Sequence, residues 1–111
     1  MEAINWNDFE KVEMRVGTIL AVNDFPEARK PAYQLTIDFG AEIGIKKSSA
    51  QITKRYSKDD LIGKQIVAVV NFPKKQIGKF MSECLVLGSV NDDEIVLLTS
   101  DLPVENGLRI A

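Results

Sequence analysis

Several segments of the chain carry the apolar patterns of β-strands. The clearest is Tyr33–Phe39, in which apolar and polar residues alternate strictly, so one face of the predicted strand is buried. Gly17 lies inside another predicted strand and indicates a bulge or bend there. Strand patterns also cover Val12–Asn23, Glu42–Lys47, Gln65–Phe72 and Ser82–Gly88, with a further strand over Glu94–Thr99.

Two short helices are predicted between these strands and before them. Asn5 or Asn7 is placed to cap a single turn near the N-terminus. After the third strand, Ser48 is followed three residues later by Gln51, which is a capping-box pattern. This pattern predicts a helix over residues 49–56, between the third and fourth strands.

The order of these elements fits an all-β architecture. Five strands with one helix between the third and fourth suit the OB-fold, a five-stranded Greek-key barrel. A different small barrel fits the same strand count, so the pattern alone leaves the topology open. In OB-folds, ligands bind across strands 2 and 3 and the loops that join strands 1–2 and 4–5. Those loops correspond here to Phe25–Pro31 and Asn71–Ser82.

The later strands are apolar on both alternating faces. This holds for Ile66–Val70, Leu85–Leu87 and Ile95–Leu98. A small barrel buries only its inner face, so the outer face needs a cover from the chain's own extensions or from a second subunit. The pattern therefore supports a homodimer as a hypothesis.

Length and composition are those of a globular protein. With 111 residues, 45% hydrophobic and 27% charged, the chain is expected to form a single domain over residues 1–111. No stretch approaches the roughly 20 apolar residues of a membrane span, and the N-terminus lacks the regions of a signal peptide. Cys84 is the only cysteine, so no disulfide framework is possible. We therefore expect a cytoplasmic protein.

Histidine is absent, which excludes Ser–His and Cys–His catalytic pairs and histidine metal ligands. Cys84 lies in an apolar run and is predicted to be a buried hydrophobic residue and not a nucleophile. Asp59 and Asp60 have no third ligand nearby, which favours a turn or helix cap over a metal site. The sequence thus predicts a protein that is not an enzyme and uses no metal or cofactor.

Positive charge is concentrated in the middle of the chain. Residues 29–79 hold eleven Lys and Arg against four acids, a net +7, while the two ends hold three against twelve, a net −9. The sum is the overall −2. A local positive face, and not a basic whole, is what a protein needs in order to bind a polyanion.

The loop Asn71–Ser82 is the most informative stretch of the chain. It carries Lys74, Lys75 and Lys79 around Gly78, with an aromatic residue near each end. Ammonium groups flanked by aromatic rings are typical of surfaces that bind nucleic-acid phosphates and bases. An ordinary solvated loop is the alternative interpretation.

Several short motifs follow one another in a specific order along essentially the whole chain. They are Met14–Ile19, Pro26–Tyr33, Ile37–Gly40, Lys47–Ile52, Asn71–Pro73, Ser82–Gly88 and Pro103–Ile110. Together they resemble the tRNA-binding module appended to methionyl-tRNA synthetases and, more closely, the CsaA family of secretion chaperones. The module usually has a His-Pro start to its first loop and Gly-Met after Ser82. Here Phe25 precedes Pro26 and Glu83 precedes Cys84, which favours the CsaA branch.

The resemblance implies an OB-fold homodimer built partly through short terminal extensions. It also implies tRNA binding and a chaperone-like affinity for unfolded or export-bound polypeptides, including preproteins. By position, the resemblance assigns Asn71, Lys74, Gly78 and Ser82 to the loop that binds tRNA. A cap that closes its own turn for Asn71 and a loop-ending hydrogen bond for Ser82 remain open alternatives.

The charges add Arg29 and Lys30 in the first loop and Lys75 and Lys79 in the second to the tRNA-binding set. Candidates for apolar contact with a polypeptide are Tyr33, Phe80 and Met81. The sequence as a whole predicts a non-catalytic tRNA-binding protein with CsaA-like chaperone activity. The alternative is a dedicated ATP-independent export chaperone for which nucleic-acid binding is incidental.

Overall fold

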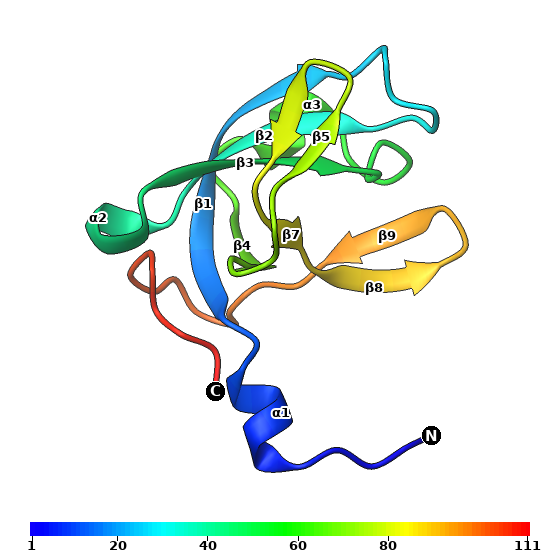
Figure 1. Cartoon of the computed structure of the whole chain (residues 1–111). Coiled ribbons are helices and arrows are strands. Elements are labelled where there is room, and N and C mark those ends of the chain that lie inside the picture. The colour runs from blue at the N-terminus through cyan, green and yellow to red at the C-terminus, as the bar shows by residue number, and fades with distance from the viewer.

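A five-stranded antiparallel sheet forms the body of the protein, as the computed structural model of residues 1–111 shows (Figure 1). The strand order is β3-β2-β1-β4-β7. The sheet curls until β3 meets the chain just before β7, where the Glu83 N–H donates to the Lys47 carbonyl oxygen at 2.7 Å. The predicted five-stranded barrel is confirmed. Its strands are β1 Met14–Asp24, β2 Tyr33–Asp38, β3 Ile45–Ala50, β4 Gln65–Val69 and β7 Leu85–Val86.

Two β-hairpins and three short helices decorate this barrel (Figure 1). The first hairpin pairs β5 (Lys75–Ile77) with β6 (Phe80–Ser82), and the second pairs β8 (Gly88–Asn91) with β9 (Glu94–Leu97). None of the helices has the length and apolar character required to cross a membrane. The helices are α1 Trp6–Glu10, α2 Gly40–Ile43 and α3 Lys58–Leu61.

The core lies inside the barrel and follows from the alternation along β2. Leu35 and Ile37 are fully buried, and they pack with Phe39 and Ile19. Gly17 serves this core and not a bulge, because a Cβ there would lie 2.7 Å from the Phe39 ring. The irregularity in β1 falls instead between Ile19 and Ala21. The prediction of a bulge at Gly17 is therefore wrong. Because Gly17 has no side chain, the Phe39 ring can pack against its backbone.

The predicted helix over residues 49–56 is absent, and the third strand is shifted towards the C-terminus. Residues 40–43 form α2, and β3 continues to Ala50. Ser48 is no helix cap, since it is fully buried in β3 opposite Leu35 and its hydroxyl donates to the Ser49 carbonyl oxygen. β2 pairs with one edge of this strand, while on its other edge the Lys47 carbonyl oxygen and the Ser49 N–H bond to residues 83 and 82. The backbone is therefore better satisfied than at the ends of a short helix.

The helix between strands 3 and 4 is the single turn α3. Ser57 caps it, because its Oγ accepts from the Asp60 N–H at 3.2 Å while Asp60 Oδ2 accepts from the Ser57 N–H at 2.9 Å. Asp60 is thus a capping residue, as the sequence favoured. The hydrogen bond from the Ser57 N–H is the main cause that holds the pKa of the Asp60 carboxyl below its ordinary value. The cap predicted at Asn5 is also confirmed, with Asp8 as its partner.

Both termini extend beyond the barrel. The C-terminal tail runs along the first half of β1, where the Val16 N–H donates to Leu108 O and the Gly107 N–H donates to Val16 O. Gly107 has φ +92°, and a Cβ on it would lie 2.6 Å from the Phe39 carbonyl oxygen, so only glycine fits. Helix α1 projects below the barrel, beside the end of this tail (Figure 1), where the Arg109 guanidinium donates to the Glu10 carbonyl oxygen at 2.9 Å. Trp6 on α1 is 65% exposed.

Candidate nucleic-acid interface

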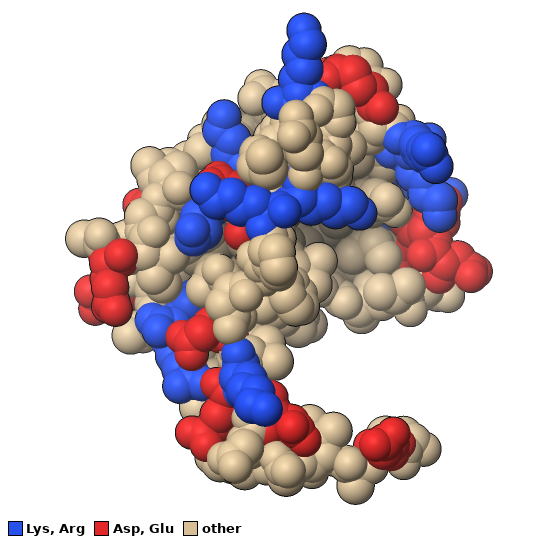
Figure 2. All heavy atoms as spheres, viewed as in Figure 1, with Lys and Arg blue, Asp and Glu red and all other residues tan.

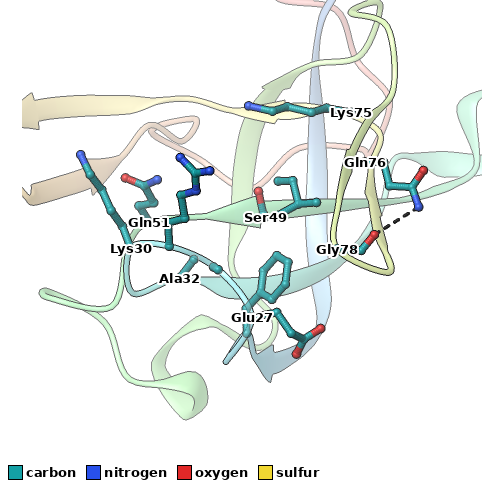
Figure 3. Close-up of a pocket in the computed structure, with 12 residues that line it drawn as sticks. Glu27, Lys30, Ala32, Ser49, Gln51, Lys75, Gln76 and Gly78 are labelled. Carbon is teal, nitrogen blue, oxygen red and sulfur yellow. Dashed lines mark hydrogen bonds between the residues drawn. The ribbon is translucent and has the colours of Figure 1, made fainter.

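The two loops that the sequence singled out face each other across the end of β3. They border a cavity of about 620 Å³, to which the first loop contributes Arg29 and Lys30 and the β5–β6 hairpin contributes Lys75. Ser49 and Gln51 form the wall between them. We call these five residues the basic groove. Figure 3 shows Lys30 and Gln51 on one side and Lys75 on the other, all directed at the same opening, with Glu27 turned away.

The β5–β6 hairpin owes its shape to its turn and its base. Gly78 has φ +59°, a conformation that glycine adopts without cost, and its carbonyl oxygen accepts from Gln76 Nε2 at 3.1 Å. At the base, Ser82 pairs with Lys75 and its Oγ accepts from the Ser49 N–H at 3.2 Å. Gly78 and Ser82 therefore position the hairpin, and with it Lys75, beside β3.

An aromatic contact fixes the hairpin to the first loop. The ring of Phe80 lies 5.2 Å from that of buried Phe25, at an interplanar angle of 57°. Such tilted pairs are favourable beyond the area that they bury. Phe80 is accordingly half-buried, whereas the sequence suggested an exposed contact. Met81, its neighbour, is 39% exposed.

Ion pairing divides the central cations into two groups. Lys54, Arg55, Lys58 and Lys74 each lie within 4 Å of a carboxylate, and Lys74 Nζ is 3.5 Å from Glu83 Oε2. The cations of the two loops that form no ion pair are Arg29, Lys30, Lys75 and Lys79. Figure 2 shows a band of Lys and Arg across the upper half of the molecule and a concentration of acids around α1.

Asn71 is committed to the N-terminal segment and does not line the basic groove. Its Oδ1 accepts from the Glu13 N–H at 3.0 Å, and its Nδ2 donates to the Lys11 carbonyl oxygen at 2.7 Å. An amide that bridges two backbone groups in this way has little left to offer a base edge. Asn71 therefore does not cap its own turn, the alternative that the sequence left open, but joins the segment after β4 to the N-terminal segment.

Apolar surface adjoins the basic groove. A second cavity of about 320 Å³ shares Ser49, Gln51 and Lys75 with it and is also lined by Phe72 and Leu85. Phe72 is 51% exposed and Leu85 is 46% exposed. Tyr33 lies elsewhere, since its hydroxyl donates to the Tyr56 carbonyl oxygen at 2.8 Å and its ring packs on the core. The structure therefore does not bring Tyr33, Phe80 and Met81 together in one cavity.

Cys84 lines the second cavity but is buried. Burial raises the pKa of its thiol to about 11, so the thiol is protonated at neutral pH. No three His, Cys, Asp or Glu side chains are grouped so that they could hold a metal ion.

The sequence reasoning missed Ser49 and Gln51, because it placed both in a helix. A strand that continues to Ala50 directs Ser48 inward and Ser49 outward, as alternation requires. The buried, strictly alternating β2 was the available signal, since its full length needs a partner strand of equal length.

Comparison with known proteins identifies the family to which the chain belongs. Residues 14–109 match the family model described as a putative tRNA binding domain. The methionine–tRNA ligase of Thermococcus onnurineus is 34% identical over 110 residues, which are 99% of this chain and 15% of that protein. The chain thus spans only about a seventh of that relative.

Two crystal structures match over nearly the full length of both chains. Chaperone CsaA from Bacillus anthracis str. Ames has a TM-score of 0.94 and 51% identity, covering 99% of this chain and 100% of that one. The CsaA chaperone protein from Picrophilus torridus has a TM-score of 0.93 and 58% identity, covering 98% and 100%. The chain therefore belongs to the family of the putative tRNA binding domain and, within it, to the CsaA proteins.

Proposed function

We propose that this protein is a non-catalytic, cytoplasmic tRNA-binding protein that contacts its ligand through the basic groove. The observation that supports this most directly is the convergence of Arg29, Lys30 and Lys75, from two loops, on one cavity without an acidic partner. Lys79 adds a fourth free cation at the hairpin turn. Guanidinium and ammonium groups arranged in this way neutralise phosphates and release their counterions. Membership of a tRNA-binding family supports tRNA as the ligand.

The remaining tRNA-binding candidates support the groove without contacting the ligand directly. Gly78 and Ser82 set the position of the hairpin. Asn71 joins the strand before the hairpin to the N-terminal segment. Lys74 adds positive charge at the margin, shared with Glu83. We assign direct phosphate contacts to the four unpaired cations and supporting roles to these residues.

Fluorescence anisotropy with labelled bulk tRNA tests the proposal. The double variant Arg29→Ala, Lys30→Ala removes two contacts. Because each contact contributes a factor of roughly 5 to 8 at 0.1 M salt, affinity should fall about 25- to 60-fold. Lys11→Ala, at the end of α1 and away from the groove, removes one charge and serves as the control, so the affinity should change little. Unchanged affinity in the double variant would refute the groove as the site.

A second function, CsaA-like chaperone activity toward unfolded or export-bound polypeptides, is proposed for the same surface. Exposed Phe72 and Leu85 lie beside the cations, so an extended segment with apolar side chains could occupy the second cavity. Met81 is exposed on the hairpin but lines neither cavity, and Phe80 packs on Phe25 and so acts only through the position of the hairpin. Tyr33 packs against the core, so we expect its effect on polypeptide binding to be indirect.

Suppression of client aggregation without ATP tests this second function. A chemically denatured client is diluted into buffer with the wild type or with the variant Phe72→Ser, Leu85→Ser, and light scattering is followed. The variant should protect less than the wild type. Ile45→Ser removes an equally exposed apolar side chain from the far end of β3 and serves as the control. Equal protection by all three proteins would argue against the second cavity.

We also propose that the protein is a homodimer. Large apolar side chains remain exposed on the terminal extensions, chiefly Ile4, Trp6, Leu102 and Leu108. A second copy would cover them, as the apolar outer faces of the late strands suggest. Sedimentation at micromolar concentration should give twice the mass of the chain, and Trp6→Ser should shift the equilibrium to the monomer. A monomer at all concentrations would exclude this assembly.

A further inference from the structure

The turn of the β8–β9 hairpin places acidic side chains beside the basic groove. Asp93 Oδ2 lies 3.4 Å from Lys54 Nζ, and Glu94 Oε1 lies 3.7 Å from Arg55 Nη1. The two partners come from the segment that follows β3, so residues about forty positions apart are brought together. We call Asp92, Asp93 and Glu94 the acidic turn.

The acidic turn and the basic groove share a wall. A cavity of about 360 Å³ is lined by Asp92 and Asp93 on one side and by Lys30, Gln51 and Lys54 on the other. Lys30 and Gln51 are also members of the basic groove. Figure 2 shows the same meeting of signs, since the blue band gives way to red at the right, where Figure 1 has the turn between β8 and β9.

The carboxylates lie where a phosphate of a bound nucleic acid would otherwise pair with these cations. Both members of the Lys54–Asp93 pair are well exposed, and exposed pairs contribute little to folding. Their effect on a polyanion is larger, because an acid at this position both occupies Lys54 and repels phosphate. The acidic turn therefore acts on binding far more than on stability.

The fold does not require acids at this turn. Asp92 has φ +54°, a left-handed conformation that asparagine adopts equally well. The hairpin is held by backbone pairing from Gly88–Leu97 to Asn91–Glu94, in which the turn side chains take no part. Neutral residues of the same shape would preserve the turn. The negative charges are therefore more relevant to ligand binding than to folding.

We propose that the acidic turn closes one end of the basic groove to nucleic acid. It confines the phosphate contacts to Arg29, Lys30, Lys75 and Lys79, and it keeps Lys54 out of the interface. This inference rests on the proposed tRNA binding, and it identifies the residues that limit the surface available to tRNA. Its distinctive consequence is a gain of affinity when acids are removed.

The test compares two doubly neutralised variants of the full chain. Asp92→Asn, Asp93→Asn removes the acidic turn's first two charges. Glu10→Gln, Glu42→Gln removes two exposed acids from α1 and α2, and α2 lies on the opposite side of the barrel from the turn (Figure 1). Both variants have the same net charge. Binding of bulk tRNA is measured by fluorescence anisotropy from 50 to 300 mM salt.

The acidic-turn variant should bind tRNA about 5- to 8-fold more tightly at 0.1 M salt, with a log–log salt slope steeper by roughly 0.7 to 0.9, because Lys54 gains a phosphate. The control should keep the wild-type slope. Equal slopes and affinities for the two variants would overturn the inference while leaving tRNA binding intact. A wild type that binds no tRNA would instead overturn the proposed function, and the inference with it. Misfolding would not increase the affinity for tRNA. Melting temperatures equal to that of the wild type would verify that both variants are folded.

Discussion

Two adjacent lysines offer a sharp test of how the groove works. Lys75 lines the basic groove and forms no ion pair, whereas Lys74 lies next to it with its ammonium 3.5 Å from the Glu83 carboxylate. The two side chains have the same charge and the same length, and they differ by one position in the sequence. Changing each in turn to glutamine removes one charge and keeps the apolar stem.

The size of the effect follows from counterion release. Arg29, Lys30, Lys75 and Lys79 give at most four phosphate contacts per chain, hence a slope of log affinity against log salt of about −2.8 to −3.6. Between 50 and 200 mM salt, the wild type should then lose about 50- to 150-fold in affinity. Lys75→Gln should reduce the magnitude of the slope by roughly 0.7 to 0.9 and lower the affinity at 0.1 M about 5- to 8-fold.

Lys74→Gln should have a smaller effect, because the wild-type charge is already shared with Glu83. Anisotropy titrations of labelled tRNA at four or more salt concentrations give both slopes, with protein at the same oligomeric state throughout. Equal changes for the two variants would refute the argument from ion pairing. It would mean that phosphate draws Lys74 away from Glu83 without cost, and that the position of a cation matters more than its partner.

The remaining predictions concern stability and reactivity. Gly107→Ala should lower the free energy of unfolding by roughly 2 kcal/mol or more in urea, because φ +92° and the Phe39 carbonyl oxygen at 2.6 Å both exclude a Cβ; a change below about 0.5 kcal/mol would contradict this. Cys84 should resist a thiol reagent at pH 8 in the native protein and react at once in urea, since burial raises its pKa to about 11; equal rates would count against its burial. A hydrogen bond from Arg15 lowers the pKa of the Glu13 carboxyl below 4.5, so its stabilising contribution is present above that pH and is lost as the pH falls through the lowered pKa. Urea midpoints between pH 6 and 3 should therefore fall less steeply in Glu13→Gln, and parallel curves would be evidence against the pairing.

The strand content of the barrel could be predicted because burial imposes alternation locally. Leu35 and Ile37 face the core and their neighbours do not, and this alternation can be recognised within the six residues of β2. The short helix α1 was equally legible, since Asn5 and Asp8 form the capping box within four residues of each other. Signals of this kind are carried by near neighbours in the chain.

The end of β3 could not be predicted, because two local rules conflict there. Ser48 and Gln51 read as a helix cap, but Ser48 is paired with Leu35 and buried. The capping pattern is worth about 1 kcal/mol, whereas the strand gains a full set of ladder hydrogen bonds and a place in the core. Only the position of β2 decides between them.

By itself, the sequence determined the barrel strands other than the limits of β3, the excess of positive charge in residues 29–79 and the two loops that hold the candidate site. The tertiary structure decided which of those charges are free. Asp93 neutralises Lys54 across thirty-nine positions of sequence, and Asn71 turns to Lys11 and Glu13 instead of a ligand. Net charge is a sum over residues and needs no coordinates, but an ion pair or hydrogen bond depends on a separation of a few ångströms, which only the folded chain establishes.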